Sequence, residues 1–208
     1  MAHLSDGIRY QRTDEFVARN IAGETVLVPV HRQIGDLESI YTLNEVATFL
    51  WERLADATTP VALALALEET FAGIRGIKGV HCCGNTDWSI LLQTSTDIIN
   101  FDTYNYAESL AIYPNEVKKF LDRGGCIAWG IVPTDAELVA KESVASLKDR
   151  LEFALELFIH KGIPFKQLLE QGLITPSCGL GPIGSETAAE RALQLTVDLS
   201  NMIRKKYL

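Results

Sequence analysis

Long apolar runs are absent from this chain of 208 residues. No segment approaches the roughly 18 uncharged apolar residues that a membrane-spanning helix needs. The N-terminal residues Met1–Arg12 are polar and lack the apolar region of a secretory signal. A hydrophobic content of 47% is nevertheless ample for a buried core. The sequence therefore predicts a cytoplasmic protein that does not enter a membrane.

Cysteine is also scarce, since the chain has four, and two of these are adjacent. Disulfide frameworks are typical of short secreted chains with many cysteines, which does not describe this sequence. Cysteine clusters in cytosolic proteins more often bind a metal or take part in catalysis. The cysteines are therefore candidate metal ligands or catalytic residues.

Positive charge is in short supply, above all in the first third of the chain. Residues 1–74 carry 5 arginines, no lysine and 11 acidic residues, whereas residues 75–208 carry 14 basic and 16 acidic residues. Nucleic-acid binding requires basic residues that replace the counterions of phosphates, so the net charge of −8 argues against it. The asymmetry predicts two domains, 1–74 and 75–208, joined by a short linker at Gly73–Gly76.

The first segment contains three short strand patterns followed by two helix patterns. Apolar alternation predicts a hairpin, with a turn at Gly23-Glu24, and then a further short strand. Asn44 is placed to cap the first helix and Thr58 or Thr59 to cap the second, in which Pro60 suits the first turn. The predicted strands are Phe16–Ile21, Thr25–Val30 and Ser39–Leu43, and the predicted helices are Glu45–Leu54 and Pro60 to about Phe71.

The second segment alternates apolar strands with amphipathic helices four times. Short loops between such elements are typical of parallel βα units and of an α/β fold. Four units amount to half of an eight-stranded (β/α)8 barrel, or to a small open sheet. The predicted strands are Gly79–Cys83, Ile98–Asp102, Cys126–Val132 and Leu173–Cys178, and the predicted helices are about Trp88–Thr94, Pro114–Arg123, Ser143–His160 and Ser185–Lys206.

His81, Cys83 and Cys178 lie where two of these strands end. Side chains alternate along a strand, so His81 and Cys83 are expected on one face, about 6–7 Å apart along the chain. With Cys178 arriving from a distant strand, three N/S ligands would leave one tetrahedral position free, as in catalytic zinc sites. The alternative is that these side chains are buried in strands without a metal, because free cysteine packs as a small hydrophobe. Cys82 and Cys126 are expected to pack in the core.

Asp102 is the candidate catalytic residue, because it too lies at a strand end. Its carboxylate has two possible roles near zinc: a fourth, exchangeable oxygen ligand, or a partner that orients His81. The alternative role is that of a cap for the helix that follows. The residues alone do not choose between these roles.

The first segment resembles the PqqD family over about residues 10–71. The resemblance is carried by the runs Gly35–Val46 and Phe49–Glu52. It implies a small winged-helix-like α+β domain that binds the leader of a precursor peptide. The third helix usual in this family is missing. Val26–Val30 or a neighbouring strand could accept a peptide as an added strand; the alternative is that these residues only form a small core.

The second segment looks like the C-terminal half of the cobalamin-independent methionine synthase and uroporphyrinogen decarboxylase superfamily, in its zinc methyltransferase branch. The resemblance implies Zn²⁺ on His81, Cys83 and Cys178, with an acidic group near Asp102. It further implies a small-molecule thiol as methyl acceptor and a methylated corrinoid or a folate as methyl donor. The runs that carry it are His81–Asn85, Asn100–Asn105, Trp129–Thr134 and Thr175–Leu180.

Half a barrel leaves two sheet edges with unpaired backbone groups. A two-fold homodimer of two halves would close them. Alternatively, a separate chain supplies the missing half, or the first segment covers the open edges. A further alternative is that the chain is a deletion remnant of marginal stability. The sequence does not choose among these.

Two functions from different classes follow. The first is a zinc-dependent, methyltransferase-like enzyme in which a bound thiol is activated, and which needs assembly to complete its barrel. The second is a PqqD-like module that binds a peptide or a partner protein and is fused to an inactive barrel remnant.

Overall fold

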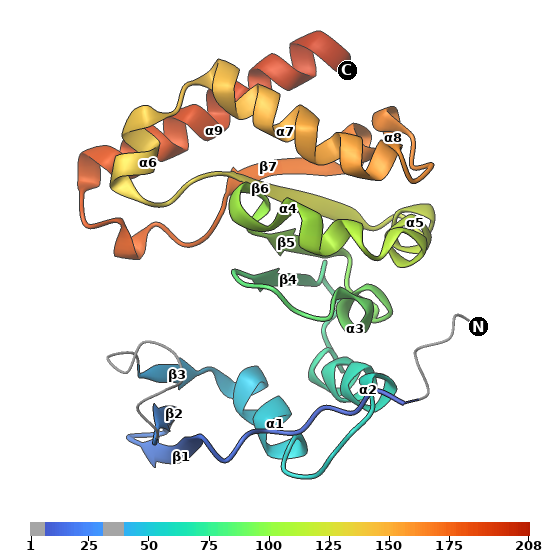
Figure 1. Ribbon diagram of the computed structural model, residues 1–208, viewed down its shortest axis with the longest axis vertical. Coiled ribbons are helices and arrows are strands. Elements are labelled where there is room, and N and C mark those ends of the chain that lie inside the picture. The colour runs from blue at the N-terminus through green and yellow to red at the C-terminus, as the bar shows by residue number, and fades with distance from the viewer. Residues whose placement is uncertain (1–6, 31–39) are drawn as a thin grey trace. The chain divides into compact units, whose positions relative to one another are not determined.

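The computed structural model describes residues 7–30 and 40–208 and divides into two compact units, Met1–Ile74 and Arg75–Leu208 (Figure 1). The first unit contains an antiparallel sheet of three strands, and the second contains a parallel sheet of four. The chain is therefore an α/β protein, as its sequence predicts.

In the first unit, β2 (Glu24–Pro29) lies between β1 (Phe16–Ile21) and β3 (Tyr41–Leu43). The β1–β2 turn consists of Ala22 and Gly23, both with positive φ (53° and 92°), one residue earlier than the sequence predicted. Two consecutive positive φ values in a two-residue loop define a type I′ hairpin, whose twist matches that of the strands. The predicted start of β3 at Ser39 lies outside the described residues.

Two helices follow β3 in this unit, and both begin at the predicted caps. The Asn44 side chain accepts a hydrogen bond from the amide of Ala47 at the start of α1 (Glu45–Arg53). Thr59 caps α2 (Pro60–Thr70) in the same way, with proline in the first turn. The buried apolar residues of this unit are Leu27 on β2 and Leu63, Ala64, Ala66 and Leu67 on α2.

In the second unit, four parallel strands lie side by side in chain order, as Figure 1 shows. Right-handed crossovers between strands that follow one another in a single direction place every connecting helix on the same face of the sheet. The strands are β4 (Gly79–Cys82), β5 (Ile98–Phe101), β6 (Cys126–Val132) and β7 (Gly172–Pro176).

The four predicted helices of this unit are present, together with three that were not predicted. The additional helices are short and begin directly after strands or loops, two of them capped by aspartate. No helix in the described part of the chain is both long and apolar enough to span a membrane. The predicted helices are α3 (Trp88–Leu92), α5 (Pro114–Asp122), α7 (Val144–Ile159) and α9 (Glu186–Tyr207), and the additional ones are α4 (Thr103–Ala111), α6 (Ala136–Lys141) and α8 (Phe165–Glu170).

The two faces of the parallel sheet differ in their covering. On one face an aromatic row, Trp88–Phe101–Trp129–Phe158, runs from α3 across β5 and β6 to α7, with ring centroids 5.4–5.9 Å apart in edge-to-face contacts. All four rings are fully buried. The opposite face carries the row that pairs His81 with Asn100, Asn100 with Ala128 and Ala128 with Leu173. Leu173 is 40% exposed there, and His81 is exposed.

Candidate metal centre

Three side chains meet at the carboxyl ends of the two outer strands, β4 and β7. The ligand atoms of His81, Cys83 and Cys178 all lie within 4.8 Å of one another. His81 belongs to β4, whereas Cys83 follows that strand in a bend and Cys178 follows β7 by two residues. The structure therefore brings together the three candidate ligands that were predicted from the sequence, although Cys83 and Cys178 lie 95 residues apart along the chain.

The exposure of these residues argues against a purely packing role. His81 and Cys83 are exposed, and Cys178 is half-buried. Residues that served only to fill a core would lie inside it, as free cysteine usually does. Cys82, which points to the opposite face, packs against the hydrophobic core, and Cys126 is half-buried at the start of β6.

The donor set fits a zinc ion in kind and in spacing. In a tetrahedral site with Zn–S of about 2.3 Å and Zn–N of about 2.0–2.1 Å, neighbouring ligand atoms lie about 3.4–3.8 Å apart. The three atoms here already lie within about 1.5 Å of that spacing. One imidazole and two thiolates also supply the soft ligands that zinc accepts, and they leave a fourth position open.

The thiols influence one another in the metal-free protein. The pKa of the Cys83 thiol is raised, first because its sulfur is partly withdrawn from water, and then through a hydrogen bond with Cys178 and the repulsion between two thiolates. Without a cation, the Cys83 thiol therefore favours its protonated form. A bound cation reverses this preference, because metal ligation requires the thiolate.

A glycine in β6 allows the loop that carries Cys178 to approach. A Cβ added at Gly130 would lie 2.3 Å from the carbonyl oxygen of Phe101 and 2.9 Å from the Cα of Ser177. The β6–β7 register shifts between Gly130 and Val132, and the amide of Ser177 donates to the carbonyl of Val132 (2.8 Å). The extra residue is Ile131, so the bulge bends the end of β6, which lies beside the end of β7 that leads to Cys178.

His81 has a polar partner that the sequence reasoning did not single out. Its Nδ1 lies 2.5 Å from Oδ1 of Asn100, which also donates through Nδ2 to Ala128 and Thr175. The available signal was a polar residue inside the apolar strand Ile98–Phe101, in register with His81. A side chain of this kind needs hydrogen-bond partners, and here one partner is the candidate ligand.

Asp102 directly follows β5 and caps α4. Its two carboxylate oxygens accept from the backbone amide and the side-chain amide of Asn105 (2.9 and 2.7 Å), and the residue is 6% exposed. The structure does not bring it into the group formed by His81, Cys83 and Cys178. The capping role proposed as an alternative is therefore observed, and a catalytic role stays a prediction.

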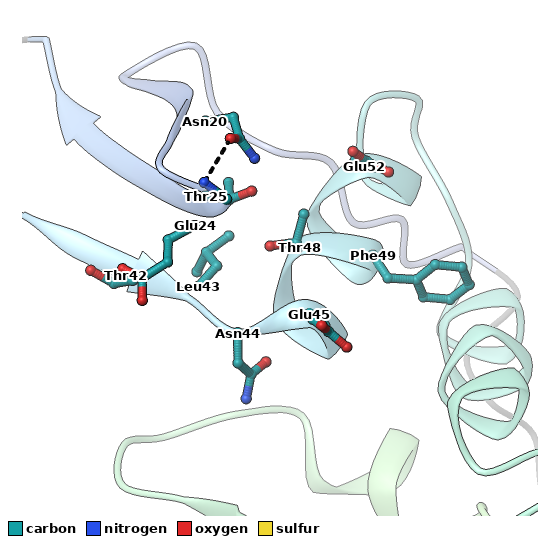
Figure 2. A pocket seen from close by; sticks show the side chains of 11 residues that line it. Asn20, Glu24, Thr25, Thr42, Leu43, Asn44, Glu45, Thr48, Phe49 and Glu52 are labelled. Carbon is teal, nitrogen blue, oxygen red and sulfur yellow. Dashed lines mark hydrogen bonds between the residues drawn. The ribbon is translucent and has the colours of Figure 1, made fainter.

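The first unit has a separate hollow of about 670 Å³. Figure 2 shows its wall, which is built from the β1–β2 hairpin, the end of β3 and the first turns of α1. Three of its lining residues are glutamates and none is basic, in keeping with the acidic composition of this segment. The lining residues are Asn20, Gly23, Glu24, Thr25, Thr42, Leu43, Asn44, Glu45, Thr48, Phe49 and Glu52.

Strand order corrects one expectation for this unit. Thr25, Val26 and Leu27 of β2 pair with both β1 and β3, so this part of the strand has no free edge for a peptide in the described part of the unit. In the described part of the unit, β1 and β3 are the outer strands. The hollow adjoins β3, so that strand is the one to consider for strand addition.

Comparison with known proteins supports the first resemblance. The family model described as coenzyme PQQ synthesis protein D (PqqD) matches residues 24–75, a quarter of the chain. The match spans β2, β3, α1 and α2, although motif residues Gly35–Ser39 lie outside the described part. No curated protein and no solved structure matches the chain. The N-terminal segment is thus similar to PqqD.

Proposed function

We propose that the second unit binds zinc through His81, Cys83 and Cys178 and activates a thiol for methyl transfer. The supporting observation is the convergence of three zinc-compatible donors within 4.8 Å at the carboxyl ends of parallel strands. Barrel enzymes place their reacting groups at this end of the sheet. The reaction class follows from the donor set together with the resemblance of this segment to zinc methyltransferases.

A zinc ion on these ligands would hold an incoming thiol as a nucleophilic thiolate at neutral pH. In the overall reaction a carbon–sulfur bond forms, the bond between methyl and donor breaks, and the donor keeps that electron pair. The thiol proton is released to water. The chain supplies two thiolates that offset the charge of the dication, and an exposed position that a small thiol can reach.

The same proposal includes half a barrel. Four parallel strands in chain order, with the helices on one face, correspond to four consecutive units of a (β/α)8 barrel. β4 and β7 each have one side without a partner strand within the second unit. Two copies related by a two-fold axis along the barrel would pair β4 of one with β7 of the other, both parallel. A separate chain with the missing half would serve equally.

Zinc stoichiometry tests the metal site directly. Purified protein, kept reduced and supplied with zinc, is expected to hold about one zinc per chain. Cys178→Ser should lose most of it, because a ligand thiolate is removed, whereas Cys126→Ser removes a cysteine outside the group and should keep it. Less than about 0.2 zinc per wild-type chain would refute the metal site. A Cys83–Cys178 disulfide in place of zinc would do the same.

A second function is supported by the family match and by the hollow of the first unit. We propose that a peptide binds beside β3 as an added strand, with side chains in the hollow. Because Glu24, Glu45 and Glu52 line it, the favoured peptide carries basic residues.

Chemical-shift titration separates this function from the first. A synthetic valine–lysine peptide is expected to shift the amides of β3 and α1, whereas a valine–glutamate peptide of equal length should not. Unchanged spectra with the basic peptide would remove the proposal without affecting the zinc site.

A further inference from the structure

Asn100 links all four strands of the parallel sheet through one side chain. It belongs to β5 and contacts His81 on β4, Ala128 on β6 and Thr175 on β7. Oδ1 of Asn100 lies 2.5 Å from Nδ1 of His81. Nδ2 of Asn100 lies 2.9 Å from the backbone oxygen of Ala128 and 2.9 Å from the hydroxyl oxygen of Thr175. The two chain segments that hold the candidate ligands are therefore joined by one amide.

The partners fix which way the amide faces. The backbone oxygen of Ala128 can only accept, so the group opposite it must be the NH₂ of Asn100. The carbonyl oxygen of the side chain is then the atom that faces His81. Amide orientation is often ambiguous, but a purely accepting backbone partner resolves it here.

The orientation of the amide sets the tautomer of the imidazole. Oδ1 of Asn100 has no hydrogen to donate, so His81 must carry a proton on Nδ1. A neutral imidazole has only one ring proton, and Nε2 is then left with a free lone pair. Metal-binding histidines commonly use this arrangement, with one nitrogen donating to a fixed acceptor while the other binds the ion.

We propose that Asn100 is a positioning residue of the metal centre, because it holds the Nδ1 proton of His81 and so presents Nε2 to the ion. The inference rests on the proposed zinc site. It adds that Nε2 of His81 is the ligand atom, and that this nitrogen is available because Asn100 holds the ring proton on Nδ1.

The tautomer can be observed in the metal-free protein by long-range ¹H–¹⁵N correlation of the imidazole. At about pH 8.5, well above the ordinary histidine pKa of about 6.5, His81 is expected in the Nδ1–H form. His160, at the end of α7, provides a reference in the same spectrum. An Nε2–H form of His81 in the wild-type chain would overturn the inference without any variant.

Zinc affinity, measured by competition with a chromophoric chelator, gives the second readout. Asn100→Leu should weaken zinc binding about 10–100-fold and allow both tautomers of His81. Thr175→Val is the matched control, because it keeps the contacts of Asn100 with Ala128 and His81, and it should change affinity less than about threefold. If Asn100→Leu does not fold, Asn100→Asp serves instead: its carboxylate still accepts the Nδ1 proton, so the Nδ1–H tautomer should persist.

The outcomes separate the inference from the proposed function. Wild-type protein that binds no zinc refutes the metal site, whatever the tautomer. Wild-type protein that binds zinc with the same affinity as a folded Asn100→Leu variant retains the site and overturns the role of Asn100. Loss of the Nδ1–H tautomer in Asn100→Asp likewise overturns it.

Discussion

At the scale of single residues, the structure shows whether a side chain caps a helix, forms a turn or lies in the candidate metal site. Asp102 shows the difficulty, because a carboxylate at a strand end is placed both to cap a helix and to reach a site. Both carboxylate oxygens of Asp102 accept hydrogen bonds from Asn105, so capping of α4 is sufficient to explain an aspartate at this position.

The Asp102→Asn variant tests the catalytic prediction for this residue. Asparagine is also a good helix cap, so the fold should persist with a loss of about 0.5–1 kcal/mol. Because Asp102 lies outside the group of three donors, zinc affinity is expected to change less than about threefold. A loss of tenfold or more in chelator competition would establish the carboxylate as a ligand or an orienting group.

Ala22 is the one non-glycine residue of the described chain with positive φ. The left-handed region costs alanine about 1 kcal/mol, and asparagine tolerates it better in an Asn-Gly type I′ turn. Ala22→Asn is therefore expected to stabilise the first unit by about 0.5–1 kcal/mol in urea unfolding. Ala22→Val should destabilise it, because a β-branched residue is disfavoured at positive φ. Equal midpoints for the two variants would contradict this account of the turn.

At the scale of elements, a buried carboxylate joins α4 to the start of α7. Glu142 is 9% exposed and accepts hydrogen bonds from Tyr104 of α4 (2.7 Å) and from Ser146, with Arg150 3.5 Å away. Burial alone would raise the pKa of Glu142, but the hydrogen bonds from Ser146 and Tyr104 and the charge of Arg150 together lower it. Folding therefore favours the ionised carboxylate.

The direction of this shift predicts a pH dependence. The stabilisation is present above the ordinary glutamate pKa of about 4.3 and is lost as pH falls through the lower pKa of the folded state. Glu142→Gln should cost about 1–2 kcal/mol at pH 7, and the difference from wild type should shrink below about pH 4. Glu137→Gln is the control, since that side chain is 86% exposed. A difference independent of pH in urea unfolding would contradict the assignment.

At the scale of the whole molecule, the outer strands β4 and β7, each without a partner on one side within the second unit, predict assembly. If two copies complete a barrel, Leu173 lies inside it, and a lysine there would bury an unpaired charge. Sedimentation is expected to give twice the chain mass for wild type and a shift to monomer for Leu173→Lys. Leu193→Lys on α9, where the leucine is 52% exposed, should leave the mass unchanged. A wild-type monomer at all concentrations would exclude two-fold closure.

The sequence predicted the elements with strong periodicity and missed those with weak signals. The strands of the parallel sheet stood out as short, largely apolar runs, three of which have a glycine at or beside one end. α4 was missed because it is short and polar, and its geometry departs from helical at Tyr106 (φ −129°, ψ 30°). Asn100 was not recognised as a partner of His81, because its significance depends on a register between strands that local patterns do not specify.

For the candidate site, the grouping of His81, Cys83 and Cys178 was predictable from the sequence, and its geometry only in part. Strand alternation predicted that His81 and Cys83 lie on one face, and their ligand atoms do lie close together. However, β4 ends at Cys82, and Cys83 lies in the bend that follows. The approach of Cys178 depends on the bulge after Gly130, which is a tertiary feature. Sequence spacing thus identifies donors, whereas packing decides where their loops lie.

The distance along the chain between Cys83 and Cys178 has a thermodynamic consequence. An ion held by both, and by His81, would tie the first strand of the sheet to the last and close a loop of 95 residues. An ion that binds only the folded state stabilises that state in proportion to the logarithm of the free ion concentration. Occupancy of the site by the ion and unfolding of the unit are therefore linked. The free zinc concentration would then set the free energy of unfolding of the second unit.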